Sequence, residues 1–218
     1  MKTILITAGP TFEPIDPVRG LTNRSTGIMG YEIAKEAARR GLAVTLVSGP
    51  VSIKPPPGVK TVCVETALDM YKAVMKTFKK ADCFVMAAAV SDYRPETVFP
   101  EKLKKRKNMT LKLTVNRDIL KSVPHLKRQV RVGFALESEN LAFNAVKKMR
   151  AKKLDFIVAN SITPSTSPFG EGDKDFTIFA RGGRTISVRN KSKVRLSKII
   201  LDMAEDILNR KKTAVFLT

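Results

Sequence analysis

The chain has 218 residues, of which 43% are hydrophobic and 28% charged, and its formal net charge is +20. This composition is typical of a globular chain with one sizeable core and excludes wholesale disorder. No apolar run approaches the roughly 20 residues of a membrane-spanning helix, which excludes a membrane protein. The first apolar run ends at Gly9-Pro10, too early for a secretion signal, so we expect a cytoplasmic location.

The first half of the chain alternates predicted strands and helices. Apolar β-prone runs predict strands at 3–8, 43–48, near 60–64 and at 82–88, and helical spacing predicts helices at 28–40 and about 67–79. Gly41 ends the first helix as a C-cap. The long loop before this helix indicates a function, although Glu13 and Asp16 within it are interpreted as ordinary surface residues.

The pattern changes after residue 88. Residues 89–110 contain Pro95, Pro100 and the basic run KLKKRK, and they predict a long, exposed and mobile flap. The rest predicts strands near 109–115, at 131–136 and at 155–160, a short helix from about 117 and a helix at 139–152. A Ser/Thr/Pro/Gly-rich loop to about 174 is followed by a hairpin over Gly182-Gly183, with strands at 175–181 and 184–189, and by an amphipathic helix at about 193–209.

Strands that are apolar on both sides and alternate with helices are typical of a parallel sheet covered by helices. The expected fold class is therefore α/β, with a three-layer Rossmann-like arrangement of a mostly parallel sheet and helices on both faces. The long flap and the C-terminal β-hairpin are additions to it. Residues 1–210 are expected to form a single nucleotide-binding domain, and residues 211–218 a frayed basic tail.

The cysteines and the histidine exclude several mechanisms. Cys63 and Cys83 each lie in an apolar stretch, which predicts buried free thiols. With His125 as the chain's one histidine, there are too few soft ligands for a zinc site. Neither cysteine has the basic neighbours that lower a thiol pKa. Thiol, zinc and serine–histidine chemistry are therefore not expected.

The glycines before the first helix are compatible with an anion site. Gly27 and Gly30 let the helix lie close to the sheet and leave backbone N–H groups for an anion. A nicotinamide oxidoreductase, however, needs G-x-G-x-x-G directly after the first strand and an acidic residue after the second. Here a long insertion precedes Gly27, and the second strand ends in Ser48-Gly49-Pro50. The oxidoreductase is therefore kept only as an alternative.

Five separated motifs, in order and in register, carry a family resemblance: TAGPTFEPIDPVRGLTNRSTGIMG (7–30), AAAVSDYRP (87–95), EKLKK (101–105), NRDIL (116–120) and VGFALES (132–138). With them the chain resembles phosphopantothenoylcysteine synthetase, the ligase of coenzyme A biosynthesis, from residue 1 to about 208. In most bacteria this domain follows a flavin-dependent decarboxylase. Because Met1 begins at the first strand, the chain resembles the free-standing form.

The resemblance implies a two-step reaction. The carboxylate of 4′-phosphopantothenate attacks the α-phosphorus of CTP, giving an acyl-cytidylate and pyrophosphate, and the amine of L-cysteine then displaces CMP. Activation is needed because a carboxylate is inert toward amines at neutral pH. Gathering several negative charges in one site requires cations, and the resemblance implies Mg²⁺. It also implies a homodimer, with the loop that carries Asn23 near the partner.

The resemblance assigns roles to individual residues. Asn23 matches an asparagine needed to turn over the acyl-cytidylate, Arg19 matches an arginine suited to a phosphate or carboxylate, and Lys102 matches a lysine that meets the triphosphate. Substrate binding falls on Arg19, Asn23 and Gly27. The implied nucleotide contacts are Met86, Ala87, Ala88, Asp92, Lys102, Arg117, Asp118, Ile119, Leu120, Phe134, Lys148 and Lys152. The metal ligands are not assigned.

Two points set this chain apart. The family usually has N-P-D-I where the chain has Asn116-Arg117-Asp118-Ile119, which adds a cation near the nucleotide and leaves open whether CTP or ATP is preferred. The net charge of +20 and the KLKKRK run also fit a nucleic-acid-binding protein, the second alternative. That reading predicts aromatic residues for base stacking, yet aromatics make up only 6% of the chain. No specific nucleic-acid partner is therefore expected.

Overall fold

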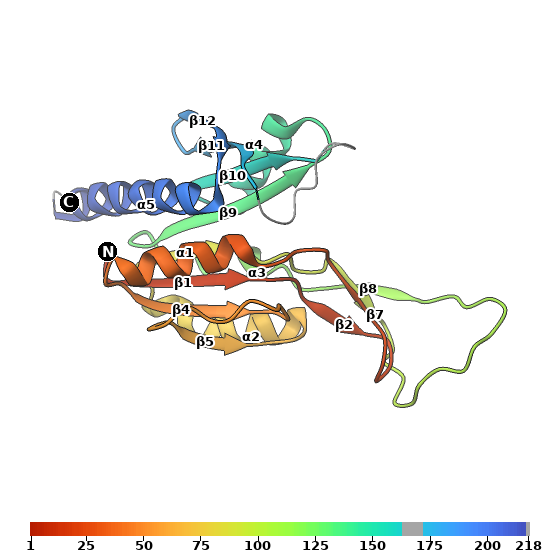
Figure 1. The fold of residues 1–218 in the computed structure, drawn as a ribbon. Helices are drawn as coiled ribbons and strands as arrows, with labels where there is room; N and C mark the ends of the chain where they lie inside the picture. Colours follow the sequence, from red (N-terminus) through yellow and green to blue (C-terminus); the bar gives the residue numbers. More distant parts are fainter. Residues whose placement is uncertain (163–171, 217–218) are drawn as a thin grey trace.

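The computed structural model describes residues 1–162 and 172–216, with side chains as far as Thr213. Its centre is an eight-stranded sheet in the order β12-β11-β10-β9-β6-β1-β4-β5 (Figure 1). The strands are β1 (Thr3–Ala8), β4 (Ala43–Ser48), β5 (Lys60–Cys63), β6 (Cys83–Met86), β9 (Val130–Glu137), β10 (Phe156–Ser161), β11 (Lys174–Ala180) and β12 (Thr185–Lys191). From β5 to β10 all neighbours are parallel, and β11 and β12 form an antiparallel hairpin at one side.

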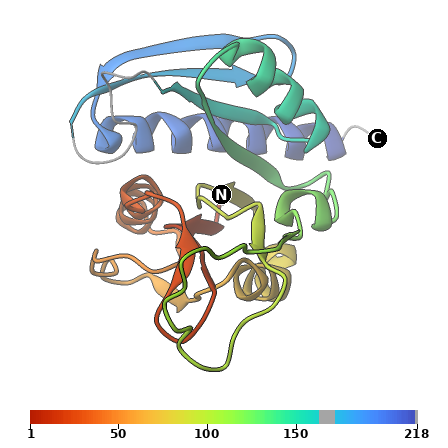
Figure 2. The same ribbon diagram turned by 90° about the vertical axis from the view of Figure 1, so that its right-hand side faces the viewer.

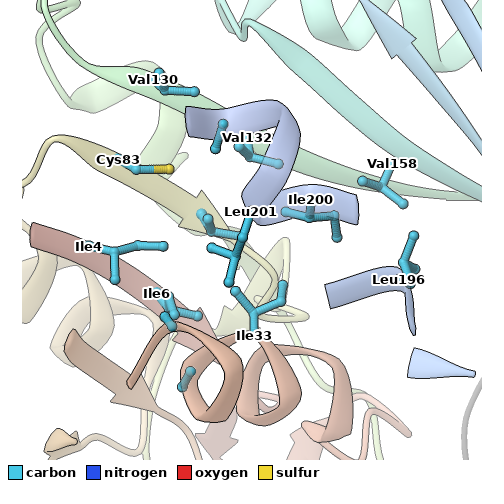
Figure 3. Packing of buried hydrophobic residues seen from close by; sticks show 14 of the residues in the cluster. Ile4, Ile6, Ile33, Cys83, Val130, Val132, Val158, Leu196, Ile200 and Leu201 are labelled. Atoms are coloured by element: carbon cyan, nitrogen blue, oxygen red, sulfur yellow. The ribbon is translucent and has the colours of Figure 1, made fainter. Parts of the chain in front are cut away.

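Helices cover both faces of this sheet, as expected. One face packs against α1 (Ile28–Arg39) and α5 (Lys193–Phe216), whose apolar residues share a buried cluster with β1, β6, β9 and β10. Figure 3 shows Ile33 of α1 and Leu196, Ile200 and Leu201 of α5 against the strands. The other face packs against α2 (Ala67–Thr77), the 3₁₀ turn η1 (Phe78–Lys80), α3 (Ile119–Ser122) and α4 (Leu141–Ala151). The three-layer Rossmann-like prediction is confirmed.

Glycines and caps fix where the first two helices begin. Gly27 precedes α1 with a φ of 78°, a left-handed conformation that favours glycine. A Cβ at Gly30 would lie 2.5 Å from the Cβ of Ala8, so α1 lies close to β1 only because this position is glycine. Thr66 caps α2, and the side chains of Thr66 and Asp69 form a reciprocal capping box.

The order of the parallel strands creates a switch point in the sheet. From β1 the chain crosses to β4 and β5 on one side, and later to β6, β9 and β10 on the other. The loops that leave β1 and β6 therefore diverge at the carboxyl ends of two neighbouring strands. In doubly wound sheets this crevice is where ligands bind.

Two small antiparallel sheets project beyond the carboxyl ends of the main strands. They are β2 (Phe12–Pro14) with β3 (Gly20–Thr22), and β7 (Tyr93–Pro95) with β8 (Leu113–Val115). We call residues 12–22 and 93–115 together the arm. Figure 1 shows the arm reaching away from the sheet, and Figure 2 looks along it from its far end. The backbone N–H of Phe99 donates to the carbonyl of Ile15 at 2.9 Å, so the two halves of the arm are joined.

Several local expectations are wrong. The loop after β1 and the start of the flap contain the short strands β2, β3 and β7, which were not predicted. Glu13 and Asp16 are buried, at 2% and 1% exposure, rather than ordinary surface residues. Both cysteines are free, but Cys63 is exposed because it ends the short outer strand β5, whereas Cys83 is buried as predicted. Burial raises the pKa of the Cys83 thiol.

The C-terminal segment also differs from the expected frayed tail. Helix α5 continues to Phe216 instead of ending near residue 209. Lys211 holds this extension, because its Nζ lies 2.7 Å from Oδ1 of buried Asp155 and donates to the carbonyl of Gln129 at 2.7 Å. The Ser/Thr/Pro/Gly-rich loop predicted before β11 lies mostly outside the described residues. None of the helices in the described part of the chain is long and apolar enough to cross a membrane.

Candidate functional site

Two adjoining pockets open at the carboxyl ends of the parallel strands. The first, which we call the switch-point pocket, has a volume of about 370 Å³ and lies between the loops that follow β1 and β6. The second, the α3 pocket, has a volume of about 460 Å³ and lies toward α3 and α4. Ala88, Val90, Asp92, Phe134 and Lys148 line both pockets, so the two form one continuous site.

Most of the site residues expected from the sequence converge here. The switch-point pocket receives Asn23, Gly27 and Ala87. The α3 pocket receives Met86, Arg117, Asp118, Ile119, Leu120 and Lys152. Ala88, Asp92, Phe134 and Lys148 belong to both. The structure thus brings together residues from distant motifs, while the role of each one stays a prediction.

Hydrogen bonds join the loop after β6 to the loop after β1. The side-chain amide of Asn23 donates to the carbonyl of Ala89 at 2.9 Å, and the N–H of Ala89 donates to the carbonyl of Gly9 at 2.9 Å. The buried hydroxyl of Thr7 accepts from the N–H of Ala88 at 3.3 Å. The two loops beside the switch-point pocket are therefore held together by both backbone and side-chain hydrogen bonds.

The α3 pocket is closed on one side by Asn116. Its side-chain amide donates to the carbonyl of Ser91 at 3.0 Å and accepts from Arg94 at 3.0 Å, and its N–H donates to the carbonyl of Asp92 at 2.7 Å. Asn116 is 9% exposed, so these bonds replace the water that its polar atoms lose. They fix the NRDIL segment against the loop that carries Asp92.

Lys148 of α4 and Lys152, which caps the C-terminus of that helix, line the site. Lys148 lines both pockets. Burial lowers the pKa of its ammonium group, and the carboxylates of Glu137 and Asp92 offset part of this shift. Lys152, one turn further on, forms an ion pair with Asp118. Without the family resemblance these lysines would be assigned to a solvated helix face. The structure instead places both cations beside a cavity of about 460 Å³.

The residues of the NRDIL segment contribute in different ways. Arg117 donates to the hydroxyl of Tyr71 at 3.0 Å and lies over its ring, with 4.8 Å to the centroid. Asp118 caps α3 by accepting from the N–H of Lys121 at 3.0 Å. Ile119 and Leu120 are buried in the core, at 2% and 7% exposure. Only their backbone atoms and small parts of their side chains can face a ligand.

Arg19 and Lys102 do not line either pocket. Both are exposed and lie on the arm, Arg19 in the turn between β2 and β3 and Lys102 in the loop between β7 and β8. The guanidinium of Arg19 is bound to the carboxylate of Asp16 and donates to the carbonyl of Leu103 at 2.9 Å. Within one chain the structure therefore places two of the three predicted catalytic residues together, but away from the third, Asn23.

Comparison with known proteins identifies the family of this chain. Residues 1–208 match the family described as the DNA/pantothenate metabolism flavoprotein C-terminal domain. The chain belongs to this family. The family resemblance drawn from the sequence motifs is thereby confirmed.

Individual relatives add detail. The chain is 43% identical over 212 residues to the coenzyme A biosynthesis bifunctional protein CoaBC of Vibrio parahaemolyticus, covering 95% of this chain and 53% of that protein. It is 44% identical over 205 residues to the protein of the same name from Escherichia coli strain K12, covering 91% and 50%. The chain thus spans about half the length of these relatives. A crystal structure of the C-terminal domain of CoaBC has a TM-score of 0.82 and 39% identity, covering 96% of both chains.

Asn160 and Lys193 are among the residues that line the switch-point pocket but were not predicted from the sequence. Asn160 lies at the carboxyl end of β10, and Lys193 is the first residue of α5. An asparagine that ends an apolar predicted strand of a parallel sheet is a signal that could have found Asn160. Lys193 offered no comparable signal, because it is one of many lysines in the chain.

The carboxylates of the site would suit a metal ion that is held mainly by the phosphates of a bound molecule. Within residues 1–162 and 172–216 no group of three or more His, Cys, Asp and Glu side chains is placed to hold a metal. This does not fit a zinc centre, which needs three or four protein ligands. It does fit Mg²⁺, which keeps several waters and binds one or two carboxylates together with phosphate oxygens. Asp92, shared by the two pockets, is the carboxylate best placed for this.

A larger cavity lies elsewhere. It has a volume of about 670 Å³ and lies between α2 and the amino ends of β1, β4 and β5. It contains none of the residues predicted for the site. Ligands of doubly wound sheets bind at the carboxyl ends of the strands, so we assign the site to the two smaller pockets.

Proposed function

We propose that this chain is a phosphopantothenate–cysteine ligase that activates the carboxylate of 4′-phosphopantothenate with CTP. The observation that carries the proposal is the convergence of Asn23, Asp92, Phe134 and Lys148 on one continuous site at the switch point. The chain's membership of the family, and its similarity to the C-terminal half of proteins named for coenzyme A biosynthesis, supply the substrate class.

In the proposed first step an oxygen of the pantothenate carboxylate bonds to the α-phosphorus of the nucleotide. The bond to the β-phosphate breaks, and pyrophosphate leaves. Two anions must approach each other, so cations at the site lower the barrier. Lys148 at the junction of the pockets supplies one fixed positive charge, and Mg²⁺ bound at Asp92 would neutralise further charge on the phosphates.

In the proposed second step the amine of L-cysteine attacks the activated acyl carbon. The new C–N bond forms, negative charge collects on the acyl oxygen, and the bond to CMP then breaks while the amine loses a proton. Asn23 lies in the switch-point pocket with an amide group that can donate to this oxygen. Its present partner is the Ala89 carbonyl, which holds the side chain in place until substrate arrives.

The α3 pocket is the proposed place for the nucleotide. Its walls combine the apolar surface of Met86 and Phe134 with the cations Arg117, Lys148 and Lys152. The ring of Tyr71 and the hydroxyl at its tip hold the guanidinium of Arg117 at the pocket's border. The family usually has proline at this position. The preference for CTP or ATP is therefore the property in which we expect this chain to differ most from its relatives.

We propose a homodimer that forms through the arm. Apolar side chains that are about half exposed or more gather there, namely Val18 (61%), Tyr93 (53%), Val98 (52%), Met109 (56%), Leu113 (47%) and Val115 (67%). An apolar group of this kind favours burial against another chain. A second copy on the arm would also explain why Arg19 and Lys102 lie outside the pockets of their own chain.

Sedimentation velocity tests the dimer. Val115→Glu should shift the chain toward monomer, because it puts a charge into the apolar surface of the arm. Phe143→Glu is the matched control, since Phe143 is 68% exposed but lies on α4, away from the arm. Equal sedimentation of wild type and Val115→Glu would refute the assignment of the arm.

A pyrophosphate-release assay tests the function itself. The purified chain is given 4′-phosphopantothenate, L-cysteine and Mg²⁺ with CTP, ATP, GTP or UTP in parallel. We expect release that depends on 4′-phosphopantothenate and is fastest with CTP. A gel shift with RNA and DNA at moderate salt tests the nucleic-acid alternative. Tight, salt-resistant binding without any pyrophosphate release would overturn the proposed function.

A further inference from the structure

Asp16 is a buried carboxylate that the roles implied by the family resemblance do not include. It lies in the turn between β2 and β3 with 1% of its surface exposed. A buried carboxylate is costly unless hydrogen bonds replace its hydration. Four groups donate to it: the backbone N–H of Val18 and Arg19, the guanidinium of Arg19, and the backbone N–H of Leu103.

The two oxygens of Asp16 have different tasks. Oδ1 accepts from the N–H of Val18 and of Arg19, both at 2.9 Å, and so closes the turn between β2 and β3. Oδ2 accepts from Nε of Arg19 at 3.0 Å and from the N–H of Leu103 at 3.1 Å. Oδ2 therefore joins the turn to a segment 87 residues further along the chain.

Arg19 also forms a hydrogen bond with Leu103. Its guanidinium donates to the Leu103 carbonyl at 2.9 Å, so the pair of Asp16 and Arg19 takes both the N–H and the carbonyl of one residue. Leu103 directly follows Lys102 in the EKLKK motif. Fixing its backbone fixes where the Lys102 side chain leaves the chain, one residue before the carbonyl that Arg19 contacts.

We propose that Asp16 is a positioning residue that holds Lys102 and Arg19 together as one cationic unit for the phosphates of the substrates. This inference rests on the proposed function, because Lys102 and Arg19 matter for the first step only if the chain activates a carboxylate with a nucleotide. The hydrogen bond from Arg19 holds the pKa of Asp16 far below its ordinary value. The carboxylate therefore stays charged at any working pH.

The neighbouring carboxylate of Glu13 shows what a purely structural role looks like in the same hairpin. Glu13 is 2% exposed, and its Oε1 accepts from the N–H of Ala67 at the start of α2, at 2.9 Å. It stabilises the end of a helix and contacts neither Arg19 nor Leu103 through that oxygen. Asp16, by contrast, accepts at Oδ2 from Arg19 itself and from Leu103, the residue that follows Lys102.

The variant Asp16→Asn separates the two tasks. An asparagine keeps an oxygen at Oδ1 for the turn, but its NH₂ group cannot accept from Leu103 or Arg19. In the full chain we expect trypsin to cleave at Lys102 and Lys104 about tenfold faster, with the urea midpoint of global unfolding little changed. Pyrophosphate release should slow about tenfold, the size of effect for one lost charge-assisted contact. Glu13→Gln, which keeps the acceptor for Ala67, should leave both rates near wild type.

A double variant decides whether Asp16 acts through Lys102. If it does, Asp16→Asn combined with Lys102→Gln is no slower than Lys102→Gln alone, because the positioned group is already absent. Independent, multiplying effects would show that Asp16 does not act through Lys102 and would overturn the proposal. An unimpaired Lys102→Gln enzyme would equally overturn the proposal.

Amide hydrogen exchange in the wild-type chain keeps the idea testable should Asp16→Asn fail to fold. The Leu103 N–H should exchange more slowly than the N–H groups of Lys102 and Lys104. An unprotected Leu103 N–H would refute its hydrogen bond to Asp16. A wild-type chain that releases no pyrophosphate at all would instead sink the proposed function. In that case protection of Leu103 would still stand as a structural fact, so the two failures are distinguishable.

Discussion

The side-chain amide of Asn23 donates a hydrogen bond of 2.9 Å to the backbone carbonyl of Ala89, across 66 positions of sequence. This contact joins the end of the arm to the loop that leaves β6, at the switch point of the sheet. It places an amide donor in a pocket where, in the proposed reaction, negative charge develops on an acyl oxygen. The first prediction tests this donor.

Asn23→Asp should separate the two proposed steps. The variant keeps the size of the side chain but replaces the donor with an anion that repels the developing charge. We expect pyrophosphate release in a first turnover at close to the wild-type rate, and amide formation slowed at least about 100-fold, the usual effect of losing one oxyanion donor. Quenched-flow analysis should reveal accumulated acyl-nucleotide. Normal amide formation would remove the assignment of Asn23.

Lys148 should control nucleotide affinity. Lys148→Met removes the cation shared by the two pockets, and we expect the KM for CTP to rise about tenfold or more. Lys147→Met is the control, because Lys147 is exposed and faces Phe143 instead. An equal rise in KM for both variants would point to general surface charge rather than to a specific contact.

The same lysine predicts a pH effect with a definite sign. Burial lowers the pKa of Lys148, so its ammonium group loses its proton at a lower pH than an ordinary lysine does. Phosphate binding needs the charged form, so the KM for CTP should be lowest well below that pKa and rise as the pH increases toward it. A KM profile between neutral and alkaline pH should show this rise in the wild type and its loss in Lys148→Met.

The sequence was sufficient to predict the strands and helices of the main sheet, because the spacing of apolar residues and the placement of glycines are local properties. The strand at 43–48 was predicted with its observed bounds, and the hairpin over Gly182-Gly183 is β11 and β12 in the structure. Buried parallel strands read as short apolar runs, and a helix that ends in glycine is a strong local signal. The layers then follow from the alternation of strands and helices.

Apart from the strand expected near 109–115, the strands of the arm could not be predicted in the same way. Its strands have three residues each, too short for a period-two pattern, and they are held by partners far away in sequence. Asp16 and Glu13 look like turn residues in the sequence, because nothing local indicates that Leu103 and Ala67 will donate to them. The position of Arg19 outside the pockets was missed for the same reason.

Gly30→Ala should destabilise the fold although alanine is the better helix former. The added methyl group would lie 2.5 Å from the Cβ of Ala8, which forces α1 away from β1. Overpacking of this kind costs about 1–3 kcal/mol, against about 1 kcal/mol gained from helix propensity. Urea unfolding measures the net loss. Lys35→Ala, on the solvent face of α1, should stay within about 0.5 kcal/mol of wild type.

Lys211→Met should show that the C-terminal extension of α5 contributes to stability. It leaves the buried carboxylate of Asp155 without its ion pair, and we expect a loss of about 1–3 kcal/mol in the free energy of unfolding. Arg210→Met, a neighbour on the exposed side of the helix, should change little. If both variants unfold at the wild-type urea concentration, residues 211–216 are the dispensable tail that the sequence suggested.

The two edge strands of the main sheet affect how copies of the chain can associate. At one border the sheet stops at β5, which has four residues and begins with exposed Lys60. At the other border β12 presents the exposed charges of Arg189 and Lys191. Short or charged borders disfavour the lateral addition of strands from another molecule. The borders of the sheet thus disfavour fibre growth, and the proposed dimer is expected to form through the arm instead.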